Sequence, residues 1–352
     1  MPIRRVLVPF LALLLAAPLG AQSAVPIPAF DPSSIDRKFG ACQDFFLFAN
    51  NGWIERNPIP PAFSSWGAFN ELTERNTQVL KGILDRAAAQ VATTTDPVAR
   101  KLGTFYATCM DSSAAERAGI DPIADVLQRI DGIADRTQLQ DELARLHSLG
   151  YGGGFGFGST SDPRDARVTI AYATQGGLGL PDRDYYLRTD VDAQSIRARY
   201  QRSIARMFEL AGDSAVAAAA RAARVLDLET ALAKAQLSRV ALRDPNTRYH
   251  RQSLAEATKS TGIDWARYLA AMGLGDLRSI TINAPPYFSA VGSALGTRPL
   301  DDWKSYLRWT VLWRSASQLS APFVDESFKL ASMLTGARQP QPRWRRSAST
   351  RA

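Results

Sequence analysis

SAVAAAARAARVLDLETALAKAQLSRVAL, residues 214–242, decides the fold class of this 352-residue chain. Alanine dominates the stretch, and alanine has the highest intrinsic helix propensity. The stretch therefore predicts one long helix, and residues 193–211 directly before it predict another. The chain is 45% apolar and 22% charged, which is ordinary globular composition and excludes collagen-like, coiled-coil and largely disordered chains.

Helical patterns continue outward from this pair toward the N-terminus. Ser64 or Ser65 can cap a long helix whose apolar residues recur every three or four positions. The apolar positions of that helix are Phe69, Leu72, Val79, Leu80, Ile83, Leu84 and Ala87. Asp96-Pro97 and Asp121-Pro122 each predict a helix start, and Thr137 with Gln140 forms a capping-box pattern.

Strand patterns are short and few. The Gly-rich residues 150–158 and the β-rich residues 167–174 predict a hairpin or small sheet, and residues 279–283 predict a strand. Helices are predicted again from Asp264-Trp265, over 299–317 and over 322–334. The expected fold class is mainly α: a multi-helix lobe with one or two short β-ribbons.

The N-terminal 24 residues have the pattern of a secretory signal peptide. Arg4 and Arg5 precede an apolar run over residues 6–18, and small residues follow up to Ala24. The run is shorter than the roughly 20 residues that cross a bilayer, although a membrane anchor is the alternative. We expect an exported chain, periplasmic or secreted, with no stable membrane anchor.

Three further regions follow the predicted signal peptide. Residues 25–63 form an extended, Pro-rich leader with one short helix near 44–50, ended by Asn51-Gly52. Residues 64–337 form the helical domain, and residues 338–352 form a basic tail. The leader has few apolar anchors of its own, so we expect it to be mobile or misplaced.

The formal net charge of +8 would by itself favour a nucleic-acid or anionic partner. Seven of the 42 basic residues, however, lie in the predicted signal peptide and the last fifteen residues, where no acidic residue occurs. This leaves 35 basic residues against 34 acidic ones in the body of the chain. The sequence therefore predicts no nucleic-acid partner.

Several catalytic patterns are absent from the sequence. A helical zinc hydrolase needs two His residues one turn apart, but His147 and His250 are 103 residues apart. Each His is therefore predicted to be structural. No Gly-x-Ser-x-Gly elbow occurs, and the Gly run lacks the spacing of a phosphate loop. Asp182 and Asp184 could act as paired acids, but beside Arg183 a salt-bridged turn is favoured.

Seven stretches, taken together, resemble the amino-terminal part of neprilysin and endothelin-converting-enzyme-like zinc metallopeptidases. They are ACQDFFLFANNGWIERNPIP (41–60), SSWGAFNEL (64–72), KLGTFYATCMD (101–111), GGLGLPDRDYYL (176–187), RDPNTRYH (243–250), FVDESF (323–328) and QPRWRR (341–346). Their order and spacing also match the family, over roughly residues 31–346.

The resemblance implies a two-lobed exported endopeptidase that cleaves oligopeptides between its lobes. The family places its zinc, its His-Glu-x-x-His motif and its Glu-x-x-x-Asp motif in the carboxy-terminal half, so no catalytic or metal-binding residue carries over to this chain. We expect a chain truncated before that half, without a cofactor of its own and inactive alone. Alternatives are a natural short paralogue, and a non-catalytic peptide-binding or partner-docking lobe that binds a full-length relative in the periplasm.

The resemblance also bears on four individual residues. Some relatives place an Arg and an acid of a substrate subsite where this sequence has Ser65 and Asn70, which marks a possible subsite region. In relatives, the cysteines that match Cys42 and Cys109 pair with cysteines this sequence lacks, since Ser347 follows the QPRWRR motif. Both cysteines are therefore predicted to be unpaired and reduced, with a non-family pairing as the alternative.

Overall fold

The computed structural model describes residues 31–349. The predicted signal peptide, residues 1–24, lies outside the described residues. The chain divides into two compact units, one that ends at Ile59 and one that begins at Pro60.

The first unit contains the 3-10 helix η1 (Pro32–Ser34) and the helix α1 (Phe45–Arg56). Asp44 caps α1 by accepting a hydrogen bond from the Leu47 backbone N–H at 2.9 Å. Our prediction that Asn51-Gly52 ends this helix is wrong, because α1 continues through both residues. Gly52 instead allows a close approach of the chain: a Cβ there would lie 2.3 Å from the Ser33 carbonyl oxygen.

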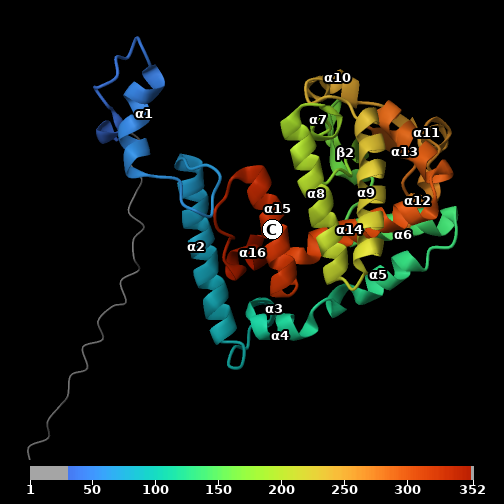
Figure 1. The fold of residues 1–352 in the computed structure, drawn as a ribbon, viewed down its shortest axis with the longest axis horizontal. Coiled ribbons are helices and arrows are strands. Elements are labelled where there is room, and N and C mark those ends of the chain that lie inside the picture. The colour runs from blue at the N-terminus through green and yellow to red at the C-terminus, as the bar shows by residue number, and fades with distance from the viewer. Residues whose placement is uncertain (1–30, 350–352) are drawn as a thin grey trace, which may run out of the picture. The chain divides into compact units, whose positions relative to one another are not determined.

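The second unit holds the remaining elements, and its described part confirms the predicted mainly α fold class (Figure 1). Its α-helices are α2 (Ala68–Ala89), α3 (Pro97–Met110), α4 (Ser112–Ala118), α5 (Ala124–Asp131), α6 (Arg136–Ser148), α7 (Asp184–Leu187), α8 (Val191–Leu210), α9 (Ala215–Ala235), α10 (Pro245–Arg248), α11 (Leu254–Thr261), α12 (Trp265–Ala271), α13 (Pro285–Thr297), α14 (Leu300–Ser315), α15 (Ala321–Thr335) and α16 (Arg343–Ser349). Its 3-10 helices are η2 (Asp121–Ile123), η3 (Ala241–Arg243) and η4 (Ala316–Gln318).

One four-stranded sheet combines the predicted hairpin with the predicted strand. Strands β1 (Phe155–Asp162) and β2 (Asp165–Gln175) form the hairpin, with Phe155 opposite Gln175. The sheet order is β1-β2-β4-β3. Strand β4 (Ser279–Ile282) runs parallel to β2 and antiparallel to β3 (Arg251–Ser253).

The core of the second unit is built around α14, which packs against α9, α8, α5 and α6. Trp303, Leu307 and Val311 of α14 are fully buried and recur every four residues, as expected for a helix face turned to a core. The buried face of α9 includes alanines together with Val225, Leu228 and Leu232. The small alanine side chains allow the neighbouring helices to pack closely against it. Figure 1 shows α8 and α9 side by side, with α14 crossing them.

Two predicted helix boundaries differ in the structure. Helix α9 stops at Ala235 and not at Leu242, because the Gln236 side chain donates to the Gly176 carbonyl and the Leu237 N–H donates to the Gln175 side chain. Helix α2 starts after Gly67, without a capping side chain from Ser64 or Ser65.

The remaining predicted helix starts differ in outcome. Asp96 caps α3 as predicted, by accepting from the Val98 N–H at 2.9 Å. A helical segment starts at Asp121-Pro122 as predicted, because η2 runs directly into α5, but the Asp121 side chain does not cap it. The cap of α6 is Asp135 in place of the predicted Thr137. Among residues 31–349, none of the helices combines the length and the apolar character needed to cross a bilayer.

Candidate functional site

The two predicted subsite residues lie at the start of α2. Ser65 is exposed and precedes the helix, and Asn70 is half-buried in its first turn. The Asn70 backbone N–H donates to the Gly67 carbonyl at 2.8 Å. Neither side chain hydrogen-bonds to another described residue, so both remain available to a ligand. Their role as a subsite stays a prediction.

Neither cysteine forms a disulfide in the structure. Cys42 is exposed in the turn before α1, and Cys109 is half-buried in the last turn of α3. Burial raises the pKa of the Cys109 thiol, which disfavours the reactive thiolate. The Cys109 carbonyl accepts a hydrogen bond from the Arg343 side chain at 2.7 Å, so its backbone joins α3 to α16.

The two histidines do not fit a zinc site. His147 is half-buried, with Nε2 bonded to the Gly153 carbonyl at 2.9 Å and Nδ1 bonded to the Tyr268 hydroxyl, so both ring nitrogens are occupied. Burial lowers the pKa of His147 to about 4. His250 bonds through Nδ1 to the Ile282 carbonyl at 3.1 Å. Within the described part of the chain, His, Cys, Asp and Glu side chains nowhere gather in a group of three that could hold a metal ion.

The acids of the GGLGLPDRDYYL motif (residues 176–187) form a structural turn. Asp182 accepts a hydrogen bond from the Asp184 N–H at 2.7 Å and forms a 2.7 Å ion pair with Arg239. Asp184 is exposed and lies 3.9 Å from Arg183. The two carboxylates therefore hold the chain locally, in agreement with the salt-bridged turn that the sequence favours.

The same motif ends in a buried polar cluster around Glu229 of α9, which the sequence did not reveal. We call Glu229, Tyr186, Tyr200 and Trp309 the Glu229 cluster. Tyr186 donates to Glu229 at 2.7 Å, and Tyr200 donates to both carboxyl oxygens at 2.9 and 3.0 Å. The Trp309 indole N–H in turn donates to the Tyr200 hydroxyl at 2.9 Å.

The side chains of the Glu229 cluster are almost completely buried, and this burial shifts the pKa values of its carboxyl and its tyrosines. Burial raises the pKa of Glu229 to about 8, against the hydrogen bonds from Tyr186, Tyr200 and the Gly179 backbone, which lower it. Burial also raises the pKa of both tyrosines well above the ordinary value. The cluster thus joins α7, α8, α9 and α14 through groups that are mostly uncharged at neutral pH.

The Gly-rich segments 150–158 and 176–179 are held together by tyrosine hydroxyls. Tyr306 accepts from the Gly154 N–H at 2.7 Å and donates to the Gly177 carbonyl at 2.8 Å. Tyr287 bonds to the carbonyls of Gly154 and Gly176. A Cβ on Gly177 would lie 2.7 Å from the Gly154 backbone, so the glycines permit a close approach of two chain segments.

The RDPNTRYH motif (residues 243–250) closes the tip of the β1–β2 hairpin. Asp162, at the end of β1, is buried and accepts from Tyr249 at 3.0 Å and from Arg251 at 3.1 Å. The hydrogen bond from the Arg164 N–H is the main cause that lowers the pKa of Asp162. A buried carboxylate with three donors is well satisfied, so this motif has a structural role.

The QPRWRR motif (residues 341–346) ties α16 to α2 and α3. Arg345 forms an ion pair with Glu74 of α2 and lies 5.1 Å from the centre of the Phe63 ring. Lys81 of α2 lies 5.6 Å from the centre of the Trp344 ring. The basic tail is therefore partly engaged by the protein itself.

Helices α2 and α3 each expose a row of apolar side chains. The α2 stripe consists of the exposed residues Phe69, Leu72, Val79, Leu80 and Ile83. The α3 stripe consists of the exposed residues Val98, Leu102 and Phe105. The spacing of three and four places each stripe on one side of its helix. The sequence predicts a helix with these apolar positions, and in the structure they are exposed, with Phe69 at 87%. Within the described part of the second unit, no element covers either stripe.

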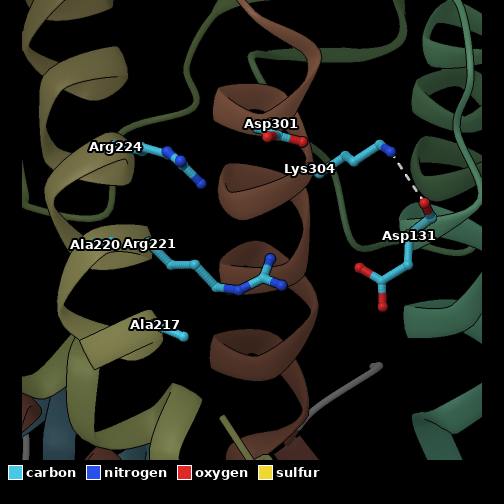
Figure 2. A pocket seen from close by; sticks show the side chains of 7 residues that line it. All are labelled: Asp131, Ala217, Ala220, Arg221, Arg224, Asp301 and Lys304. Atoms are coloured by element: carbon cyan, nitrogen blue, oxygen red, sulfur yellow. Dashed lines mark hydrogen bonds between the residues drawn. The ribbon is translucent and has the colours of Figure 1, made fainter. Parts of the chain in front are cut away.

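One hollow lies between α9, α14 and the end of α5 and measures about 490 Å³ (Figure 2). Arg221 and Arg224 reach into it from α9. Arg221 forms an ion pair with Asp213 at 2.9 Å, and Lys304 donates to the Asp131 carbonyl at 3.0 Å, as the dashed line shows. Because its cations are intermixed with acids, the hollow is a solvated ion-pair surface and supports no catalytic role.

Residues 41–351 match the family model of peptidase family M13, in the part that describes its N-terminal domain. The chain belongs to peptidase family M13. The resemblance to neprilysin and endothelin-converting-enzyme-like metallopeptidases that the motifs predict is thereby confirmed.

Curated M13 relatives include bovine and human endothelin-converting enzyme 1. This chain is 27% and 26% identical to them, over 92% of its own length but only 44% and 43% of theirs. The crystal structure of the zinc metalloprotease ZMP1 of Mycobacterium tuberculosis with an inhibitor is 32% identical and superposes with a TM-score of 0.85, over 91% of this chain and 49% of that one. PepO from Lactobacillus rhamnosis, 20% identical with a TM-score of 0.73 over 87% of this chain and 48% of its own, shares the fold. The M13 chain therefore spans about half the length of its relatives.

The sequence around Glu229 contains a local signal for a buried polar network. Glu229 stands beside Leu228 and one helical turn before Leu232 and Ala233, all on the buried face of α9. A carboxyl on an otherwise apolar helix face must find donors, which predicts a buried network. Its partners lie 29 to 80 residues away in the sequence, so only the fold identifies them.

Proposed function

We propose that this M13 chain is the amino-terminal region of an exported neprilysin-like zinc metalloendopeptidase that acts on oligopeptides, and that it is inactive by itself. The observation that carries the proposal is the exposure of the α2 and α3 stripes in a chain whose family match is continuous. Exposed apolar patches of this kind mark surfaces that bind another protein domain.

The proposed occupant of the stripes is the catalytic half of an M13 peptidase. Burial of a side chain as exposed as Phe69 stabilises a complex by on the order of 2 kcal/mol, and eight large apolar side chains belong to the two stripes. The chain aligns with under half of endothelin-converting enzyme 1, so the relatives possess a second half to fill this role.

Inactivity of the isolated chain is supported by its own side chains. Both ring nitrogens of His147 are engaged, and His250 lies at the start of β3 without a second ligand beside it. In this proposal the zinc belongs to the half of the relatives that the match does not cover. Export is supported by the charge and hydropathy pattern of residues 1–24.

Zinc analysis combined with a peptidase assay on the purified chain tests the proposal. We expect no zinc above the level of a chelator-treated control and no hydrolysis of a quenched fluorescent oligopeptide. One zinc per chain together with turnover would overturn the proposal.

A second experiment tests the stripes separately. The variants Phe69→Ser and Phe105→Ser should lower binding of a hydrophobic dye, while the control Val216→Ser should not, although Val216 on α9 is 83% exposed. An equal fall for the control would show that the stripes are not a distinct surface.

A partner-docking lobe is the second candidate, and the same stripes favour it. In that case the chain would bind a full-length M13 relative in the same compartment. Co-purification of the two at micromolar concentration would support this function, and the absence of any complex would exclude it.

A further inference from the structure

A second cavity of about 270 Å³ lies between the two Gly-rich segments and α14. Six glycines line one side of it, so we call it the glycine-walled cavity. They are Gly152, Gly153, Gly156, Gly176, Gly177 and Gly179. Because a glycine wall carries no side chains, the space stays open and backbone groups face it.

The opposite wall of the glycine-walled cavity is aromatic. Trp309 and Trp313 of α14 stack with ring centres 5.5 Å apart and planes inclined by 28°, and Tyr151 also lines the cavity. The indole N–H of Trp309 is already bonded to Tyr200. Trp309 is only 2% exposed, so the accessible ring surface comes from the half-buried Trp313 and Tyr151, and it suits an aromatic or large aliphatic side chain.

One cation lines the cavity within the described part of the chain, and it is Arg314. Arg314 is exposed and forms no ion pair or hydrogen bond with another described residue. Its guanidinium can therefore take a carboxylate without giving up a partner, and the geometry of the two groups is complementary.

The single acid of the cavity lining does not oppose an anion. Glu229 is 1% exposed and already accepts hydrogen bonds from Tyr186 and Tyr200. Its pKa of about 8 leaves it mostly uncharged at neutral pH. A cationic ligand would thus find little charge on Glu229 and would be repelled by Arg314.

We propose that the glycine-walled cavity binds the carboxy-terminal residue of a peptide, with its side chain against Trp313 and its α-carboxylate on Arg314. The volume fits this occupant: at about 30 Å³ per water, the cavity has room for about nine waters, enough for one amino-acid side chain. The inference goes beyond the proposed function, because it concerns this lobe alone and requires neither zinc nor a second half.

Calorimetric titration of the full chain with three small probes tests the proposal. The probes are N-acetyl-phenylalanine, N-acetyl-phenylalanine amide and phenylalanine amide, which present a carboxylate, no charge and an ammonium group. We expect the acid to bind at least about tenfold more tightly than either amide, as a charged hydrogen bond in a partly enclosed site provides. N-acetylglycine should bind more weakly than N-acetyl-phenylalanine because it lacks the ring.

Two variants and one control locate the site. Arg314→Gln should weaken binding of the acid about tenfold, to the level of the uncharged amide. Trp313→Ala should weaken binding of the acid and of the uncharged amide alike. Arg224→Gln is the matched control, because Arg224 is an exposed arginine in the other hollow, and it should change nothing.

Three results would overturn the proposal. Equal affinity for the acid and the uncharged amide would remove the role of Arg314. Tightest binding of phenylalanine amide would show that the cavity selects a cation through Glu229. Absence of binding by the acid at millimolar concentration would show that the cavity is not a peptide site, and none of these outcomes depends on zinc or on hydrolysis.

Discussion

Replacement of Tyr200 by Phe removes one hydroxyl from the Glu229 cluster and leaves the packing of the ring nearly unchanged. The hydroxyl donates to Glu229 and accepts from the Trp309 indole, and the site is fully buried. The variant therefore loses one hydrogen bond and leaves one buried N–H without an acceptor.

The two losses can be estimated separately. A lost hydrogen bond between neutral groups lowers the free energy of unfolding by about 1 kcal/mol, and an unsatisfied buried donor lowers it by about 1–3 kcal/mol. We expect a total of about 2–4 kcal/mol for Tyr200→Phe. The loss should grow by about 1 kcal/mol between pH 6 and pH 9, because an ionised Glu229 gains more from each donor than a protonated one.

Urea unfolding followed by far-UV circular dichroism measures the effect at both pH values. The matched control is Tyr185→Phe, in the same motif, because the Tyr185 hydroxyl has no hydrogen bond to another described residue. The control should change the free energy of unfolding by less than about 0.5 kcal/mol. A loss for Tyr200→Phe no larger than that of Tyr185→Phe, or one independent of pH, would refute the role assigned to the Glu229 cluster.

Three further predictions follow from burial and close packing. The pKa of Glu229 is about 8 in the folded chain against an ordinary value of 4.5, so the unfolded chain loses this proton first as pH rises. The contribution of Glu229 to the free energy of unfolding should therefore fall by about 5 kcal/mol between pH 4.5 and pH 8. Urea unfolding of Glu229→Gln should lack this pH dependence. His147 has a pKa of about 4 against 6.5, so protonation of this group favours the unfolded chain. Its contribution to the free energy of unfolding should fall by about 3 kcal/mol as pH falls from 6.5 to 4, which offsets part of the gain from Glu229 over the same range; a His147→Gln variant with the same pH profile as the wild type would contradict this. Gly103→Ala should destabilise the chain by about 1–3 kcal/mol in thermal unfolding, because the new Cβ would lie 2.2 Å from the Ala87 carbonyl oxygen, whereas Gly82→Ala, which meets only the end of a flexible side chain, should stabilise it by up to about 1 kcal/mol.

Local sequence signals predicted the elements that depend on local chemistry. Asp96 and Asp264 cap helices where Asp-Pro and Asp-Trp predict them, and the hairpin forms where Gly-rich and β-rich residues meet. Helix α13 was not predicted, although Pro285 and Pro286 occupy its first turn, where proline is tolerated.

Distant contacts decided what the local signals missed. Helix α9 ends early because Gln236 bonds to a loop 60 residues away. Helix α1 continues through Gly52, and the residue there is glycine because the chain at Ser33 passes too close for a Cβ. In both cases the competing contact comes from a segment that no short window of sequence includes.

The candidate sites divide in the same way. The family, the absence of a zinc-binding pair and the structural roles of His147 and of the turn at Asp182 follow from residue types and their spacing. The Glu229 cluster and the glycine-walled cavity do not, because they combine groups from α7, α8, α9, α14 and two Gly-rich segments that are far apart in the sequence.

The sequence by itself determined the fold class and the M13 family of this protein, since helix propensity, capping and motif order are properties of short segments. The tertiary structure alone decided which apolar faces are buried. The α2 stripe has the spacing of a core face and yet is exposed, because burial requires a second surface and no described element of the second unit covers it. Periodicity specifies that a helix has an apolar side; only the neighbouring elements decide whether that side meets protein or water.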